Sequence, residues 1–189
     1  MFLETILCRE GKAHHLPYHQ RRLDATLRIL GFTRKYTLSR LITPPQSGVY
    51  RCRFLYDGLD FTIEYHPYVP RTISSLRVLI DDTINYPLKT TEREALEALY
   101  RQRDGCDDVV IVRNGFLSDT TVANIAVFDG YRWLTPEKPL LEGTTRSRLI
   151  EEGTLFPAPL RLDDIAAARK IAVMNALMGF VEVENGIII

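Results

Sequence analysis

The spacing of apolar residues along residues 1–70 predicts three strands and one long helix. Alternation in the segment LETILC favours an opening strand, because successive side chains of a strand point to opposite faces. Leu23, Leu27 and Leu30 recur instead at helical spacing, and Gly31 suits the end of that helix. The expected elements of this part are a strand at 3–8, helices at 17–30 and 37–42, and strands at 49–58 and 60–68.

Residues 76–189 show shorter apolar runs that are separated by turn dipeptides. Asn114-Gly115, Asp129-Gly130 and Asn185-Gly186 each favour a tight hairpin turn. The clearest helix is expected at 88–105, with Thr90 or Thr91 as its cap. The other expected elements are strands at 76–81 and within 107–119, 122–136 and 171–189, and helices at 143–153 and 165–170.

The segment VPRTISS interrupts both patterns and indicates a connector between two lobes. We therefore expect a small N-terminal α/β lobe at 1–70, a linker at 71–75 and a larger lobe at 76–189. The larger lobe is expected to be mostly antiparallel β structure with helices. The predicted fold class is α+β.

Composition narrows the class of protein. The 189 residues are 46% hydrophobic and carry 24 basic and 24 acidic side chains, so no nucleic-acid partner is expected. No apolar run is long enough for a membrane partner, and the first residues show no signal-peptide pattern. Cys8, Cys52 and Cys106 form no C-x-x-C pair and have no histidine nearby in sequence, so neither a metal site nor thiol catalysis is indicated. These features favour the cytoplasm.

Two motifs carry candidate chemistry at expected helix starts. Lys89 lies at the very start of the expected helix at 88–105, where the helix dipole favours a neutral, nucleophilic amine; otherwise it is an ordinary surface lysine. Thr144 and Thr145 follow Gly143, where backbone N–H groups and hydroxyls suit an anion such as phosphate. The alternative there is a simple helix cap.

Three polar residues elsewhere are also open to two interpretations. Arg22, or its neighbour Arg21, suits a bidentate phosphate contact, or faces solvent. Asp119, in the stretch LSDTTVAN, suits the ring nitrogen of a cofactor, or accepts hydrogen bonds from turn amides. Asn124 either braces such a site or stabilises the turn.

In their common order these segments resemble one family, the class IV aminotransferases of pyridoxal 5′-phosphate (PLP) fold type IV. The matching segments are FLETI, HQRRL, LKTTER, LSDTTVAN and LLEGTTR, and the resemblance covers nearly the whole chain. It implies a two-lobed fold like that of D-amino-acid aminotransferase, with PLP as the cofactor. It also implies that Lys89 carries the cofactor, that Asp119 meets its ring nitrogen beside Asn124, and that Arg22, Thr144 and Thr145 bind its phosphate.

Two departures from the family pattern lie close to the expected cofactor. Asp119 stands where the family has Glu, so the carboxylate is one methylene shorter. Glu142 stands where the family has Pro, and it adds a negative charge near the expected phosphate site. A protein that keeps the fold and lacks catalysis is therefore one alternative.

Arginines bear on the small-molecule substrate. Arg93 resembles an arginine of the lyase branch, and Arg51 and Arg53 share one face of a strand, where they suit a substrate carboxylate or surface ion pairs. A chorismate-derived substrate carries two carboxylates, so we expect 4-amino-4-deoxychorismate lyase, which releases pyruvate and gives 4-aminobenzoate for folate synthesis. The alternative enzyme is a class IV aminotransferase of branched-chain or D-amino acids. The resemblance also implies a homodimer.

Overall fold

The computed structural model describes residues 1–184 and 186–188, and the chain divides into two compact units. The first unit contains Met1–Pro70 and Leu88–Glu92, and the second contains Arg71–Pro87 and Arg93–Ile189. The predicted Asn185-Gly186 turn includes Asn185, which lies outside the described residues. Among the described residues, no helix is both long and apolar enough to cross a membrane.

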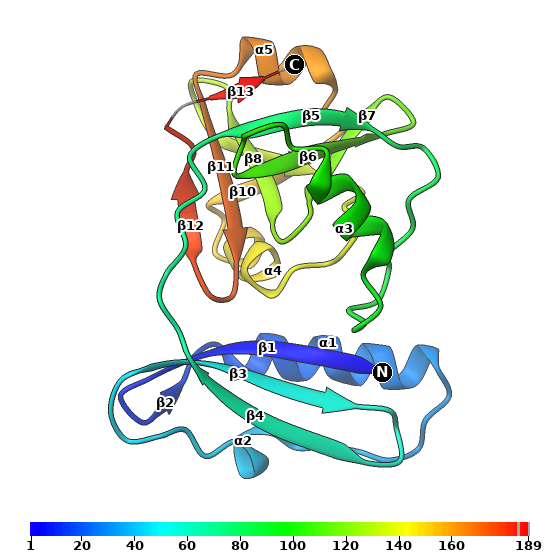
Figure 1. Ribbon diagram of the computed structural model, residues 1–189, viewed down its shortest axis with the longest axis vertical. Coiled ribbons are helices and arrows are strands. Elements are labelled where there is room, and N and C mark those ends of the chain that lie inside the picture. Colours follow the sequence, from blue (N-terminus) through cyan, green and yellow to red (C-terminus); the bar gives the residue numbers. More distant parts are fainter. Residues whose placement is uncertain (185, 189) are drawn as a thin grey trace. The chain divides into compact units, whose positions relative to one another are not determined.

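The first unit is an antiparallel sheet of four strands with helices packed on it (Figure 1). The strands lie in the order β2-β1-β3-β4. Their bounds and those of the helices are β1 Phe2–Arg9, β2 Lys12–Ala13, α1 Leu16–Ile29, α2 Leu38–Leu41, β3 Val49–Tyr56 and β4 Phe61–Pro67. The strand–helix–strand order expected from the apolar spacing is present.

The core of this unit forms where α1 covers the sheet. Leu23 and Leu27 point inward from α1, one helical turn apart, and pack in one buried cluster with Ile6 of β1 and Phe54 of β3. Removal of this apolar surface from water stabilises the unit. The same inward stripe of α1 also contains His19, which is buried.

The sequence pattern predicted that a helix begins at residue 88, but residues 88–92 are not helical. The N–H of Leu3 donates to the Lys89 carbonyl at 3.0 Å, and the N–H of Thr91 donates to the Met1 carbonyl at 2.9 Å. This pairing with the start of β1 uses backbone groups that a helix would need, and it places the segment in the first unit. Helix α3 therefore begins at Glu94, with Arg93 as the N-cap residue.

The second unit is built on a mixed sheet, which is mostly antiparallel (Figure 1). Its strands follow the order β10-β9-β8-β7-β6-β5-β13, and β11 pairs with β8 and β12. The elements are β5 Leu76–Ile80, α3 Glu94–Arg101, β6 Asp108–Arg113, β7 Phe116–Thr120, β8 Asn124–Phe128, β9 Trp133–Pro136, α4 Thr144–Glu151, β10 Leu155–Ala158, α5 Leu162–Ala167, β11 Lys170–Asn175, β12 Gly179–Glu182 and β13 Ile187–Ile188.

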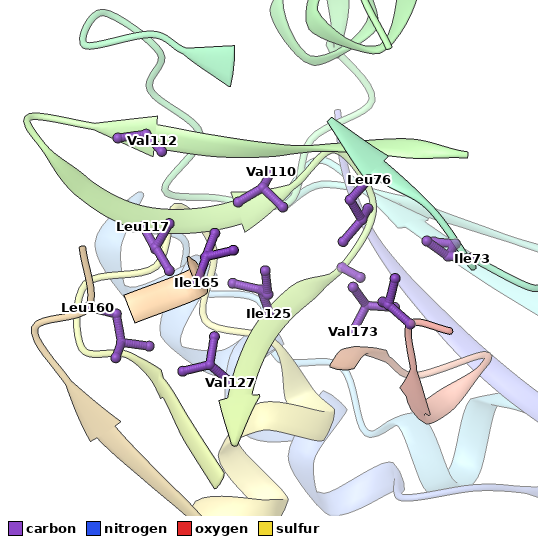
Figure 2. Packing of buried hydrophobic residues seen from close by; sticks show 12 residues of the cluster. Ile73, Leu76, Val110, Val112, Leu117, Ile125, Val127, Leu160, Ile165 and Val173 are labelled. Atoms are coloured by element: carbon purple, nitrogen blue, oxygen red, sulfur yellow. The ribbon is translucent and has the colours of Figure 1, made fainter. Parts of the chain in front are cut away.

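Side chains from these strands and from α5 converge on one apolar interior. Figure 2 shows Val110 of β6, Leu117 of β7, Ile125 of β8 and Val173 of β11 pointing toward one another. Ile165 reaches the same interior from α5. Because this packing fixes β7 against β8, polar side chains at the ends of these two strands are held in defined positions.

Candidate active site

Asp119 and Asn124 meet across neighbouring strands. Asp119 lies near the end of β7 and pairs with Asn124, the first residue of β8. Asn124 Nδ2 donates hydrogen bonds to Asp119 Oδ1 at 2.7 Å and to the Leu141 carbonyl oxygen at 2.9 Å. The N–H of Leu141 donates to Asp119 Oδ2 at 2.9 Å. Two neutral donors, one for each oxygen, therefore fix the orientation of this carboxylate.

The two threonines that follow the acid, and not the acid itself, build the turn between β7 and β8. Thr120 Oγ1 accepts hydrogen bonds from the N–H groups of Val122 and Ala123, at 3.2 and 3.0 Å. Thr121 Oγ1 donates to Asp108 Oδ1 at 2.6 Å. Hydroxyls thus satisfy the turn locally, which explains why polar residues stand where a two-residue hairpin would otherwise serve.

Arg93 holds the same turn from the start of α3. Its Nη2 donates to the Thr121 carbonyl at 2.7 Å, and its guanidinium lies 5.7 Å from the centre of the Tyr86 ring. The sequence predicted Arg93 as a substrate contact, but these groups engage the protein's own backbone and an aromatic face. Arg93 therefore holds the turn that follows Asp119, and its contact with a substrate stays a prediction.

The ionisation of Asp119 is strongly perturbed. The residue is 4% exposed, and burial raises the pKa of Asp119 from an ordinary 3.8 to about 7. Hydrogen bonds from Asn124 and Leu141, together with the charge of Arg146, act to lower this pKa, while the charge of Glu142 acts to raise it. A carboxylate with only neutral donors is well suited to a further, cationic N–H donor such as a protonated pyridine nitrogen.

The first turn of α4 lies against the same pair of residues. Gly143 is the N-cap residue and provides no side-chain cap, and Thr144 and Thr145 behind it are buried. A Cβ on Gly143 would lie 1.8 Å from Asn124 Oδ1, so the close approach of the helix to Asn124 requires glycine. The start of α4 therefore lies against Asn124, and its backbone N–H groups with the two threonine hydroxyls are a donor set that fits a phosphate.

The charge of Glu142 is paired within this helix start. Arg146 Nη1 donates to Glu142 Oε2 at 2.7 Å, and Arg146 Nη2 donates to the Pro136 carbonyl at 2.8 Å. The Glu142 side chain is 66% exposed, whereas that of Arg146 is buried. The negative charge that the sequence placed near the phosphate site is therefore offset by a buried cation. The same arginine joins the two ends of the loop that carries Leu141.

In the first unit, Arg22 belongs to a buried cluster with Glu4 and His19. Arg22 Nε donates to Glu4 Oε1 at 2.8 Å, and Arg22 Nη2 donates to Glu4 Oε2 at 2.6 Å. His19 Nδ1 donates to Glu4 Oε2 at 2.6 Å. Glu4 and His19 are each 1% exposed. The bidentate geometry is the strong form of an arginine–carboxylate contact.

This cluster contains an ionised acid and a neutral imidazole. Burial acts to raise the pKa of Glu4, but the charge of Arg22 and the hydrogen bonds from His19 and Arg22 lower it to about 2. Burial lowers the pKa of His19 despite the neighbouring Glu4, and the charges of Arg22 and Lys89 act in the same direction as burial. Since ionised Glu4 only accepts hydrogen bonds, the imidazole proton lies on Nδ1.

Lys89 lies in the segment that pairs with β1 and is half-buried. Helix α3 begins at Glu94 and not at residue 88, so Lys89 is not part of a first helical turn. The structure places Lys89 instead in the electrostatic surroundings of His19, within the first unit.

The two arginines of β3 have different surroundings. Arg53 Nη1 donates to Glu64 Oε2 at 2.8 Å on the neighbouring strand β4, where Glu64 also contacts His66 Nε2 at 3.0 Å. The ion-pair interpretation therefore holds for Arg53. Arg51 is exposed and lies opposite His66 in the sheet register.

Sequence reasoning assigned no role to Glu4, His19 or Leu141. A signal existed for the first two, because Glu4 shares the inward face of β1 with Ile6, and His19 lies four residues before the buried Leu23 on α1. A polar side chain at a core position of an amphipathic pattern needs a buried partner. Leu141 contacts Asp119 through its backbone N–H, and a pattern of side chains cannot predict such a contact.

Comparison with known proteins places this geometry in a family. The model of the amino-transferase class IV family matches residues 1–185. The chain therefore belongs to the class IV aminotransferase family, and the sequence resemblance and the predicted fold class are confirmed.

Individual proteins show how far the similarity extends. A crystal structure from Haemophilus somnus 129PT, provisionally assigned as a 4-amino-4-deoxychorismate lyase, is 30% identical, with a TM-score of 0.88 over 94% of this chain and 96% of that chain. A Schizosaccharomyces pombe protein, provisionally assigned as an aminodeoxychorismate lyase, is 26% identical and matches 95% of this chain and 86% of its own length. The PLP-bound form of a hypothetical aminotransferase from Mycobacterium tuberculosis shares the fold, with 21% identity and a TM-score of 0.80, over 98% of this chain and 82% of that chain.

Proposed function

We propose that this protein is a PLP-dependent enzyme, and specifically a 4-amino-4-deoxychorismate lyase that releases pyruvate and forms 4-aminobenzoate. One observation carries the cofactor proposal: the buried Asp119 carboxylate has only neutral hydrogen-bond donors and a pKa raised to about 7 by burial. An acid in this state gains most from a cationic N–H partner. The provisional assignments of the Haemophilus somnus and Schizosaccharomyces pombe proteins support the lyase reaction.

The proposed cofactor site uses side chains for three purposes: to bind the ring nitrogen, to bind the phosphate and to transfer protons. PLP, when bound, supplies an electron sink for the substrate carbanion. Asp119, which Asn124 holds in place, would accept the ring N–H. Thr144 and Thr145 would bind the phosphate at the start of α4, and Arg22 would be a further phosphate donor. Lys89 would carry the cofactor and would move protons at its amine nitrogen as general base and acid.

The substrate carboxylates have one remaining candidate on β3. Arg53 and Arg93 donate to Glu64 and to the Thr121 carbonyl, so Arg51 is the arginine we propose for a substrate carboxylate. A transaminase of branched-chain or D-amino acids would use the same cofactor residues, and similarity to solved aminotransferase folds keeps it as the second candidate. A homodimer and a cytoplasmic location stay predictions.

The first experiment tests the cofactor. Purified protein mixed with PLP should absorb visible light, and borohydride reduction followed by peptide mass spectrometry should place the label on Lys89. Lys89→Ala should abolish the label, whereas Lys138→Ala, at an exposed lysine, should keep it. A protein that stays colourless and takes up no PLP would refute the enzyme proposal in favour of a non-catalytic protein with this fold.

The second experiment separates the two reactions. Aminodeoxychorismate should give equal amounts of 4-aminobenzoate and pyruvate, and Asp119→Asn should lower this turnover by roughly 10²-fold or more, as loss of a partner for developing charge does. Branched-chain, aromatic and D-amino acids are then offered with 2-oxoglutarate. Turnover of the second set alone would replace the lyase by the aminotransferase.

A further inference from the structure

We propose that Glu4 and His19 are positioning residues that fix the direction of the Arg22 guanidinium, so that Arg22 recognises a phosphate group through geometry more than through net charge. This inference rests on the proposed function, because it deepens the role of Arg22 in PLP binding. It concerns only residues of the first unit, and their contacts can be followed from β1 to α1.

The contacts at Glu4 leave its carboxylate no freedom to rotate. Arg22 Nε and Nη2 reach one oxygen each, at 2.8 and 2.6 Å. His19 Nδ1 adds a third hydrogen bond, at 2.6 Å, to Oε2. Three short bonds therefore fix the acid, and the acid in turn fixes the direction of the guanidinium through its Nε and Nη2 atoms.

The local charges argue against simple attraction of an anion. The positive charge of Arg22 is already offset by ionised Glu4, and His19 is neutral. The other charged group close to His19 is Lys89, on the segment paired with β1. A guanidinium that is neutralised by its own carboxylate binds a phosphate well only if it is already oriented, because the ordering cost is then met during folding.

The first unit contains a natural comparison for this cluster. Glu64 on β4 also accepts hydrogen bonds from an arginine and a histidine, Arg53 at 2.8 Å and His66 at 3.0 Å. The residue types are the same, but the Glu64 side chain is 36% exposed and that of Glu4 is 1% exposed. Glu64→Gln is therefore a matched control for Glu4→Gln.

The experiment compares PLP with pyridoxal, which lacks the phosphate. Dissociation constants of both are measured by absorbance on the full chain carrying Glu4→Gln, Glu64→Gln or no change. We expect Glu4→Gln to weaken PLP binding about tenfold or more and to change pyridoxal binding little, since small misplacements of binding groups have effects of this size. Glu64→Gln should change neither. Unchanged or tighter PLP binding in Glu4→Gln would overturn the proposal, because a mere counter-charge predicts tightening.

Two further variants keep the test decisive. His19→Asn retains an N–H donor near the position of Nδ1 and should bind PLP better than His19→Ala; this pair replaces Glu4→Gln if that variant does not fold. Nitrogen NMR should report the neutral Nδ1–H form of His19 in the unaltered protein and its loss in Glu4→Leu, which removes the acceptor oxygen. Equal PLP binding in the two His19 variants, or an imidazole signal that Glu4→Leu leaves unchanged, would contradict the inference.

Arg22→Gln separates this inference from the proposed function. If Arg22→Gln leaves the preference for PLP over pyridoxal intact, then Arg22 does not hold the phosphate and that part of the proposed function fails. If Arg22→Gln reduces the preference and Glu4→Gln does not, then only the positioning role of Glu4 fails.

Discussion

Each unit of this protein contains a buried carboxylate whose pKa departs far from its ordinary value, and these two acids, Glu4 and Asp119, have opposite properties. Glu4, in the first unit, accepts three hydrogen bonds, two of them from a guanidinium, and its pKa falls to about 2 although burial acts to raise it. Asp119, in the second unit, accepts one bond from an amide side chain and one from a backbone N–H. Burial raises the pKa of Asp119 to about 7.

The difference lies in whether the unit itself supplies a cation for the buried acid. Both groups lose their hydration, but only Glu4 receives a cation from its own unit to offset that loss. Asp119 is oriented as carefully as Glu4, yet its ionised form lacks a direct cationic partner in the second unit. Asp119 is oriented, but its ionised form is unfavourable in the absence of a cation. These two properties are those expected of an acid that binds a cationic ligand.

The largest effect should follow removal of the cation from Glu4. Arg22→Leu leaves a buried carboxylate with only His19 as donor, and we expect a loss of about 3–5 kcal/mol in the free energy of unfolding at pH 7. Urea denaturation measures this loss. Adding Glu4→Gln should recover part of it, because the buried charge is removed. A loss below about 1 kcal/mol would mean that the pairing of Glu4 contributes little.

The raised pKa of Asp119 should appear in the pH dependence of the free energy of unfolding. Its pKa is raised from 3.8 to about 7 on folding, so the folded state binds more protons in this range and stability falls as pH rises from about 4 through 7. The full difference is on the order of 4 kcal/mol. His19, whose pKa burial lowers, acts in the opposite direction, so the measured quantity is the unaltered protein minus Asp119→Asn. A flat difference curve would contradict the raised pKa of Asp119.

The loss of stability at acid pH should come mainly from Glu4. Its pKa is lowered from 4.5 to about 2, so the stability that it contributes is complete above pH 4.5 and is lost as pH falls through 2. We expect a loss on the order of 3 kcal/mol across this window. Denaturation curves at pH 2 to 5 should show a much shallower dependence in Glu4→Gln than in Glu64→Gln. Parallel curves for both variants would assign this loss to other groups.

A smaller effect should appear where α4 approaches Asn124. Gly143→Ala places a Cβ 1.8 Å from Asn124 Oδ1, so Asn124 or the helix start must shift. We expect a loss of about 1–3 kcal/mol in stability, as for other overpacked sites, together with weaker PLP binding. The double variant with Asn124→Ala removes the clashing atom. The double variant should therefore lose less stability than the sum of the two single losses. Strictly additive losses would show that the contact is relaxed without cost.

The smallest effect is expected at the exposed counterpart of the Glu4 cluster. Arg53→Leu breaks the ion pair with Glu64, and solvent screens both side chains, so the loss in stability should be about 0–1 kcal/mol. Thermal unfolding of Arg53→Leu and Arg22→Leu under one buffer gives the comparison directly. Equal losses would show that burial does not distinguish the two clusters.

Much of the fold was accessible from sequence periodicity. Alternation along β1 and helical spacing along α1 predicted the first unit, and the order of motifs identified the family. The pattern failed at residues 88–92, where helix-forming residues pair with β1 instead. Local propensity carries no information on a partner strand almost ninety residues away in sequence, and that partner places Lys89 outside any helix.

The sequence alone determined which side chains are available: an acid and an amide five residues apart around two threonines, a glycine before a second pair of threonines, and a glutamate and a histidine on inward faces. The tertiary structure decided what surrounds each of them. Burial, the bidentate arginine at Glu4 and the neutral donors at Asp119 set the two pKa values in opposite directions. Desolvation and pairing depend on groups brought close in space, so residue type and spacing do not set their sum.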